Sequence, residues 1–237
     1  MMHSFMIVCE QRRYLLLLGA LLTLLVIEPI ASSFGIMGSL FDVLLVFVMV
    51  ILVLALARDK VWRVVACILC IPAAMLSIGG HLLPSSAQVV SVTAGHAIGA
   101  LFFVVVAGRI VRSIFTSREV SLDSIFGAIC GYLLLGIAWA LMYAMMHAAN
   151  PESFQFDDSV RQQMEQGDYG RNVFIYYSFV TLTTVGYGDV TPLSIPARTL
   201  SWVEAMTGQL YLAVLIAGLI SALVARNTAR IRQEGDH

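Results

Sequence analysis

Apolar residues run in long, nearly unbroken stretches along this chain. Six stretches are candidates for membrane-crossing helices, which need about 20 mostly apolar residues: residues 14–27, 40–57, 61–83, 89–110, 124–147 and 199–225. A seventh stretch, 173–182, is too short to cross and is typical of a re-entrant or buried helix. The ten-residue alternation of an outer-membrane barrel is not visible in the sequence. The pattern predicts an all-α integral membrane protein with six transmembrane helices and one re-entrant helix.

Lysine and arginine residues gather beside one set of helix ends. Cytoplasmic loops are enriched in these residues, so the pattern predicts that both termini are cytoplasmic and that the stretch at 173–182 enters from the outside. The first span could instead be a signal peptide, but Glu28-Pro29 interrupts it and no clean cleavage site follows, so we expect it to be retained. Eleven of the 14 basic residues lie on the predicted inner side: Arg12, Arg13, Arg58, Lys60, Arg63, Arg109, Arg112, Arg118, Arg226, Arg230 and Arg232.

Composition narrows the class of protein further. Hydrophobic residues make up 59% of the 237 positions and charged residues 12%, about half the charged fraction of an ordinary soluble domain. This excludes a soluble globule and a disordered chain, and the net charge of −1 offers no basic field for nucleic acid. We expect a multi-pass protein of the cell membrane. No catalytic pair, metal-ligand cluster or phosphate loop occurs at a usable spacing, so an enzyme is not expected.

A polar segment with helix-cap residues at 116–123 divides the chain into two predicted domains. Residues 1–118 form a bundle of four transmembrane helices, and residues 119–237 contain the last two spans with the short helix between them. The chemistry is concentrated in the second part, at residues 173–192, which read VFIYYSFVTLTTVGYGDVTP. Irregular backbone at membrane depth survives only when it is buried in protein or lines water. Alternating glycines allow successive carbonyl groups to face one axis, where four copies could replace the water around a small cation.

This stretch resembles the pore helix and selectivity filter of potassium channels, and the resemblance covers roughly residues 123–226. It implies that K⁺ ions in the filter are coordinated by Thr184, Val185, Gly186 and Tyr187, with Thr184 using its hydroxyl at the inner end. The remaining filter residues would have supporting roles: Gly188 shapes the outer turn, Asp189 holds the outer mouth, Tyr176 and Tyr177 brace the filter from the side, and Thr183 is a further supporting residue. No organic cofactor is expected. Each chain has one filter sequence, so a closed cage of carbonyls requires a homotetramer.

The last span contains three further candidate residues. Gly208 lies where the resemblance places a gating hinge, and Gly218 is a second candidate, although close packing against a neighbouring helix would equally explain Gly208. Glu204 is an ionisable residue in a predicted span and therefore a functional candidate. We expect it to lie buried behind the filter, with Thr181, Thr183 or Arg198 as its partner.

The fourth span decides between modes of gating. A voltage sensor needs arginines spaced across the membrane, but Arg109 and Arg112 both lie at the cytoplasmic end of this span and are expected to anchor it to anionic lipids. The sequence therefore predicts a potassium-selective channel with weak or no voltage dependence. Two alternatives remain open: a voltage-gated channel with a degenerate sensor, and a non-conducting sensor or regulatory subunit that keeps a pore fold.

Overall fold

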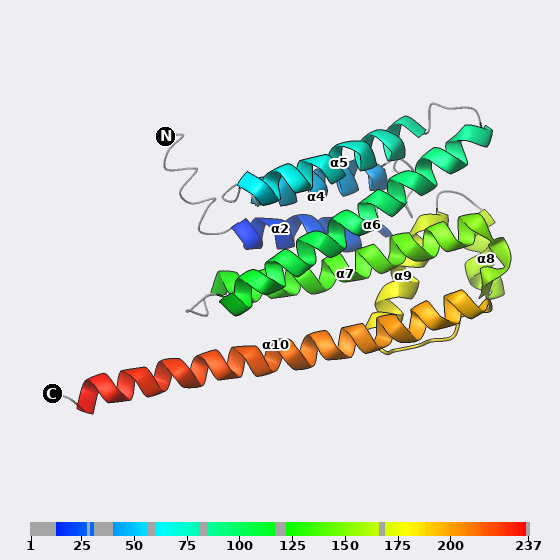
Figure 1. Cartoon of the computed structure of the whole chain (residues 1–237). Helices are drawn as coiled ribbons and strands as arrows, with labels where there is room; N and C mark the ends of the chain where they lie inside the picture. The colour runs from blue at the N-terminus through cyan, green and yellow to red at the C-terminus, as the bar shows by residue number, and fades with distance from the viewer. Residues whose placement is uncertain are drawn as a thin grey trace.

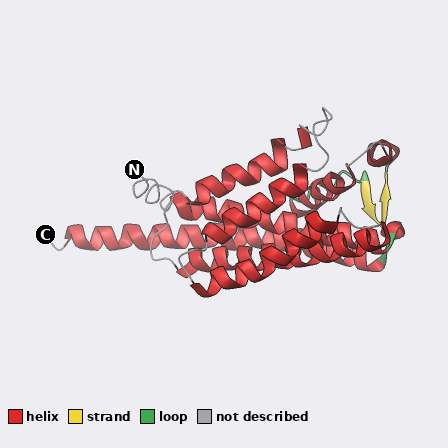
Figure 2. Ribbon diagram, turned by 90° about the horizontal axis from the view of Figure 1, so that it is seen from above, coloured by secondary structure: helices red, strands yellow, loops and turns green. Residues whose placement is uncertain are grey.

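The computed structural model describes residues 13–27, 29–30, 40–55, 60–80, 85–116, 122–165 and 169–235. The predicted domain boundary at residue 118 lies outside these residues. Within them the chain is an elongated assembly of helices with one small two-stranded sheet at one end (Figures 1 and 2).

The first half of the chain consists of helices that lie alongside one another (Figure 1). α6 packs along both α5 and α7, while α2 contacts α7 and α4 contacts α5. Their shared core is made of aliphatic and aromatic side chains such as Leu17, Leu52, Phe102 and Leu134, all at most 1% exposed. The helices of this part are α2 (Arg13–Leu22) with a following π-helical turn η1 (Thr23–Ile27), α4 (Leu40–Ala55), α5 (Lys60–Gly80), α6 (Ser85–Thr116) and α7 (Leu122–Ala149).

Small residues let α5 and α6 approach closely. A Cβ added to Gly95 of α6 would lie 2.6 Å from Ser77 Oγ and 2.9 Å from the backbone nitrogen of Ser77 on α5. Gly95 therefore allows close contact between the two helices, as small residues do between membrane helices.

The second half of the chain folds back from the end of α7. A 3₁₀ turn η2 (Pro151–Ser153) leads into β1 (Phe154–Phe156) and α8 (Asp158–Glu165), and α9 (Tyr169–Leu182) then enters between α7 and α10 (Figure 1). Residues 183–189 lead to β2 (Val190–Pro192), which pairs antiparallel with β1 so that Gln155 faces Thr191. α10 (Ile195–Gly235) completes the chain.

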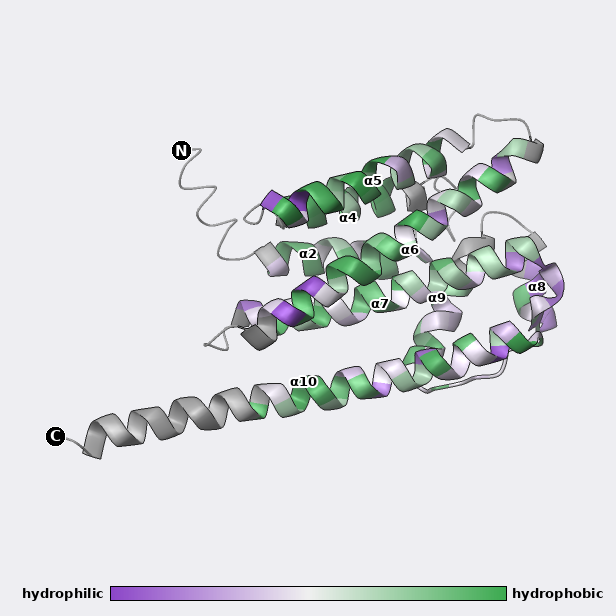
Figure 3. Ribbon diagram, in the orientation of Figure 1, coloured by the Kyte–Doolittle hydropathy of each residue, from purple (hydrophilic) through white to green (hydrophobic). Residues whose placement is uncertain are grey.

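Four helices among the described residues are long and apolar enough to cross a membrane: α5, Val90–Ser113 of α6, Asp123–Ala149 of α7 and Ile195–Gly218 of α10. The apolar helices at Tyr14–Ile27 and Val43–Leu54 are shorter than the 18 residues this criterion requires, so four of the six predicted spans meet it. The segment predicted to be too short to cross is the apolar helix Val173–Leu182. Green, hydrophobic residues fill the middle of the bundle, and purple, hydrophilic residues gather around α8 (Figure 3).

The 41 residues of α10 make it much longer than a membrane crossing. At about 1.5 Å per residue the helix is roughly 60 Å long, about twice the hydrocarbon thickness of a bilayer, and it extends well past the other helices (Figure 1). Its apolar part leaves many side chains exposed in the single chain: Trp202, Met206, Leu210, Leu212, Val214, Ile216 and Ile220. Such a surface requires lipid or protein to cover it.

The close packing of α9 on α7 can be tested by substitution. A Cβ on Gly136 of α7 would lie 2.6 Å from Cζ of Phe179 on α9. We expect Gly136→Ala to destabilise the protein by about 1–3 kcal/mol through overpacking, measured as a lower midpoint of thermal unfolding in detergent. A second change, Phe179→Leu, should restore part of the loss.

The matched control is Gly108→Ala on α6, where a Cβ would meet nothing within 4 Å. Alanine there should leave the midpoint unchanged or raise it slightly, since alanine favours a helix over glycine by about 1 kcal/mol. Equal effects of the two substitutions would contradict the close contact.

Candidate functional site

The C-terminus of α9 is closed by a Schellman cap. The amide of Thr184 donates to the carbonyl of Thr181 and the amide of Val185 donates to the carbonyl of Val180, both at 2.9 Å. In this motif the residue after the helix is left-handed and is usually glycine. Here it is Thr184 with φ of 59°, although a β-branched residue is disfavoured in that region. The unusual backbone of Thr184 is thus fixed by the end of the helix before it.

Left-handed backbone recurs at every second residue after this cap. Gly186 has φ of 60° and Gly188 has φ of 83°. Alternating right- and left-handed residues make successive peptide groups point the same way, whereas along a strand they point alternately to opposite sides. The side chains of this segment are exposed in the single chain, with Val185 at 52% and Tyr187 at 72%. The backbone has the alternation that the glycine spacing predicts, and Thr184 extends it by one position.

The last carbonyl of α9, that of Leu182, is held from two sides. The Tyr132 hydroxyl of α7 donates to it at 3.2 Å. On the other side Gly208 of α10 packs so closely that a Cβ there would clash with the same oxygen. Close packing is therefore a sufficient reason for a glycine at 208. α10 runs as one continuous helix through Gly208 and the half-buried Gly218, and a hinge at either position stays a prediction.

Asp189 ties the end of this segment to its surroundings through three hydrogen bonds. Its Oδ2 accepts from the Tyr176 hydroxyl at 2.5 Å, and its Oδ1 accepts from the amide of Val190 at 3.1 Å. Its carbonyl oxygen accepts from the amide of Asp157 at 2.8 Å. The ring of Tyr176 also lies parallel to that of Tyr187, with centroids 6.5 Å apart. Tyr176 therefore interacts with this segment at two points, Asp189 and Tyr187.

Tyr177 and Thr183 make different contacts from those of Tyr176. The Tyr177 hydroxyl lies 2.6 Å from Ser201 Oγ on α10, so within this chain it links α9 to α10. The Thr183 hydroxyl donates to the carbonyl of Phe179 at 2.6 Å, one turn back in the chain. The Thr183 hydroxyl thus bonds within the last turn of α9 and is not the partner of Glu204.

Glu204 is fully buried between α7, α9 and α10, at 0% exposure. Its Oε2 accepts a hydrogen bond from the Tyr143 hydroxyl at 2.6 Å, and its Oε1 lies 2.5 Å from Ser178 Oγ. The buried position agrees with the expectation from the sequence. Its partners differ from those expected from the sequence. Glu204 bonds to Tyr143 and Ser178, and not to Thr181, Thr183 or Arg198. The Arg198 side chain instead donates to the carbonyl of Pro192 at 3.1 Å.

Proton counting identifies a protonation state of Glu204 that satisfies every polar group around it. Ser178 Oγ lies 2.8 Å from the carbonyl oxygen of Gly136 as well as close to Glu204. A serine hydroxyl carries one hydrogen, and the carbonyl of Gly136 can only accept. When Ser178 donates to that carbonyl, the hydrogen between Ser178 and Glu204 must come from the carboxyl group. The arrangement is satisfied by a neutral Glu204 that donates to Ser178 and accepts from Tyr143.

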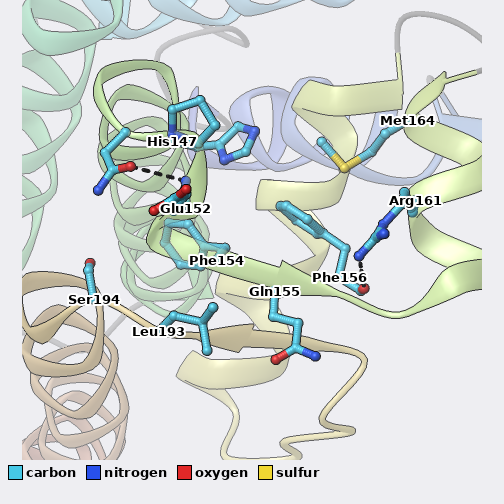
Figure 4. A pocket seen from close by; sticks show the side chains of 11 residues that line it. His147, Glu152, Phe154, Gln155, Phe156, Arg161, Met164, Leu193 and Ser194 are labelled. Carbon is cyan, nitrogen blue, oxygen red and sulfur yellow. Dashed lines mark hydrogen bonds between the residues drawn. The ribbon is translucent and has the colours of Figure 1, made fainter.

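An outer cap, formed by residues 150–165 and 190–194, covers this end of the molecule. Phe154 and Phe156 of β1 are buried against α7 and α9, where Phe154 contacts the rings of Tyr143 and Tyr177 edge-on. Beside them lies an open hollow of about 830 Å³, bounded by the end of α7, by β1 and α8, and by Leu193 and Ser194 (Figure 4). Because β1 pairs with β2, the cap is joined directly to the segment that ends at Asp189.

Several residues that hold the site together escape prediction from sequence. Ser178 and Ser201 resemble any small residue in an apolar helix. Tyr132 and Tyr143, however, lie 11 residues apart on α7, or about three helical turns, so their hydroxyls belong to one face. Two hydroxyl-bearing rings on one face of a membrane helix were a usable signal, because such groups must find partners when they are buried.

Comparison with known proteins agrees with this geometry. Residues 127–225 match the family model described as "Ion channel". These residues span α7, α9, the segment with alternating left-handed backbone and most of α10. The match supports an ion channel family.

Among curated proteins, the chain is similar to "Protein LctB" of Bacillus caldotenax, with 29% identity over 104 residues. The similar part covers 42% of this chain and 72% of that protein. No solved structure matches. Together with the long apolar helices, the family match supports a membrane protein that transports ions.

The two tyrosines of α9 provide a matched pair of substitutions. Tyr176→Phe removes the hydrogen bond to Asp189, whereas Tyr177→Phe removes one to Ser201, away from residues 184–188. We expect Tyr176→Phe to shorten the conducting periods in single-channel recordings several-fold, because a charge-assisted bond of about 1.5–3 kcal/mol is lost. Tyr177→Phe should leave these periods within twofold of wild type, and the reverse ranking would contradict the role of Asp189.

Substitutions of Glu204 test its neutral state. Glu204→Gln keeps both hydrogen bonds, because its amide can donate to Ser178 and accept from Tyr143, so the thermal midpoint should change little. Glu204→Ala leaves two buried hydroxyls without that partner and opens a cavity, at a cost of roughly 3 kcal/mol per chain. Adding Tyr143→Phe to the alanine variant should recover part of this cost. A glutamine variant as unstable as the alanine variant would argue for a buried charge.

Proposed function

We propose that this chain is the subunit of a homotetrameric potassium channel that conducts K⁺ passively across the cell membrane. In this proposal residues 183–189 are the selectivity filter, α9 is the pore helix, and α7 and α10 are the outer and inner helices of the pore. Both termini are cytoplasmic and the filter opens to the outside. The observation that carries the proposal is the alternation of left-handed backbone at Thr184, Gly186 and Gly188 within the sequence TVGYG.

Ion binding would use oxygen atoms from four chains. The carbonyls of Val185, Gly186 and Tyr187, together with the Thr184 hydroxyl, would replace the hydration shell of K⁺. The exposure of this segment supports the proposal, because apolar side chains such as Val185 need cover that one chain does not give. Three further chains around a common axis would provide it, and they would also cover part of the apolar surface of α10.

Weak or absent voltage dependence is part of the proposal. From residue 85 to residue 108, α6 contains no Asp, Glu, Lys or Arg. The guanidinium of Arg109 lies 5.7 Å from the centre of the Trp62 ring, near the start of α5. Moving one charge through the field yields only about 2.3 kcal/mol per 100 mV, so a helix without charges across its middle cannot drive steep gating. Arg109 and Arg112 would instead anchor the helix ends at anionic lipids.

Gly186→Ala tests the proposal directly. A Cβ at Gly186 would meet nothing within 4 Å in this chain, but φ is +60° there, a conformation that costs an L-residue about 1–2 kcal/mol. We expect this substitution to abolish K⁺-driven flux into proteoliposomes while the tetramer persists by size-exclusion chromatography with light scattering. Gly79→Ala on α5, which also meets nothing within 4 Å, should conduct as wild type does.

The same assay separates the alternatives. K⁺ flux with a steep dependence on membrane potential would indicate a voltage-gated channel. A verified wild-type tetramer that passes neither K⁺ nor Na⁺ over a range of potentials and pH would overturn the proposal in favour of a regulatory subunit.

A further inference from the structure

Gln209 follows the glycine that packs against the end of α9. Because Gly208 lies directly against the Leu182 carbonyl, the next residue of α10 comes within reach of Thr184, the innermost of the proposed ion ligands. The side-chain nitrogen Nε2 of Gln209 lies 3.5 Å from Thr184 Oγ1. Both residues are exposed in the single chain.

The surroundings of Gln209 along α10 make an amide there unusual. Residues 210–220 read LYLAVLIAGLI, and Tyr211, the one residue of this run with a hydroxyl, already donates to the carbonyl of Ala128 at 2.6 Å. A polar amide at membrane depth is costly unless it is hydrogen-bonded or wet. Contact with Thr184 meets this need, and it places an N–H donor beside a proposed ion ligand.

An N–H donor at Thr184 changes what its oxygen can do. A threonine hydroxyl oxygen has two lone pairs, and an N–H bond to one of them competes with a cation for the electron density of the oxygen. The amide also fixes the orientation of the hydroxyl. Conduction requires that an ion bind strongly enough to enter and weakly enough to leave. A donor at the inner end of the filter weakens binding at the innermost site and favours release.

We propose that Gln209 is a positioning residue that tunes the innermost ion site by donating a hydrogen bond to the Thr184 hydroxyl. This inference rests on the proposed channel function. Its ligand is a dehydrated monovalent cation held at Thr184, and its effect is to keep that cation from binding too tightly. Loss of the donor therefore deepens the innermost site, which K⁺ reaches first from the cytoplasmic side.

The experiment is single-channel recording in planar bilayers with the K⁺ concentration varied on the cytoplasmic side only. Gln209→Leu should lower the K⁺ concentration that gives half-maximal outward current, and the maximal outward current, each by at least about twofold. Gln209→Asn keeps the amide but is one carbon too short to reach Thr184, so it should behave like the leucine variant. The control is Thr207→Val, because the Thr207 hydroxyl bonds within its own helix, to the carbonyl of Val203 at 2.7 Å; it should match wild type.

A double-mutant cycle shows whether the effect passes through the hydroxyl. In a Thr184→Ser background, which keeps the hydroxyl, Gln209→Leu should have its full effect. In a Thr184→Val background, which lacks it, Gln209→Leu should change neither quantity further. The inference is overturned if wild type conducts K⁺ and Gln209→Leu and Gln209→Asn leave the half-maximal concentration unchanged, or if the effect persists without the hydroxyl. Absence of K⁺ current in wild type would instead refute the proposed function.

Discussion

The end of α9 is the constraint on which the rest of the site depends. A helix end leaves carbonyl groups that need hydrogen-bond partners. Here the Schellman cap satisfies two of these carbonyls, and Tyr132 of α7 satisfies the carbonyl of Leu182. Because the cap requires left-handed backbone at its last residue, Thr184 begins the alternation that Gly186 and Gly188 continue. The conformation of residues 184–188 thus begins with the way in which α9 ends.

Three helices cooperate to hold this end in place, each through contacts that allow little adjustment. Gly136 of α7 packs against the ring of Phe179, and Gly208 of α10 packs against the carbonyl of Leu182. Between them the buried carboxyl group of Glu204 joins a hydroxyl from α7 to one from α9. Small residues set the distances between the helices, and the buried polar network sets their register, since each hydroxyl has few alternative partners. A substitution at any of these contacts should therefore displace residues 183–189.

The sequence was sufficient to predict the long apolar helices, the short apolar helix at residues 173–182 and an unusual backbone at Gly186 and Gly188, because these follow from apolar run length and from glycine. It could not predict left-handed backbone at Thr184, since threonine disfavours it and only the cap imposes it. The partners of Glu204 were predicted wrongly for a related reason: Tyr143 is 61 residues away in the chain, and only the packing of α7 on α10 brings them together. The pairing of β1 with β2 could not be predicted from the sequence, because each strand is only three residues long.

The pairing of β1 with β2 joins the segment before α8 to the segment between α9 and α10. Residues 153–157 are hydrogen-bonded to residues 189–194, and a shift of one position would turn Gln155 inward and Phe154 and Phe156 outward. Residues 153–157 therefore help to position Asp189 although they precede it by more than 30 residues in the chain. Insertions and deletions during evolution should be rare within this stretch, because added length there would shift Asp189.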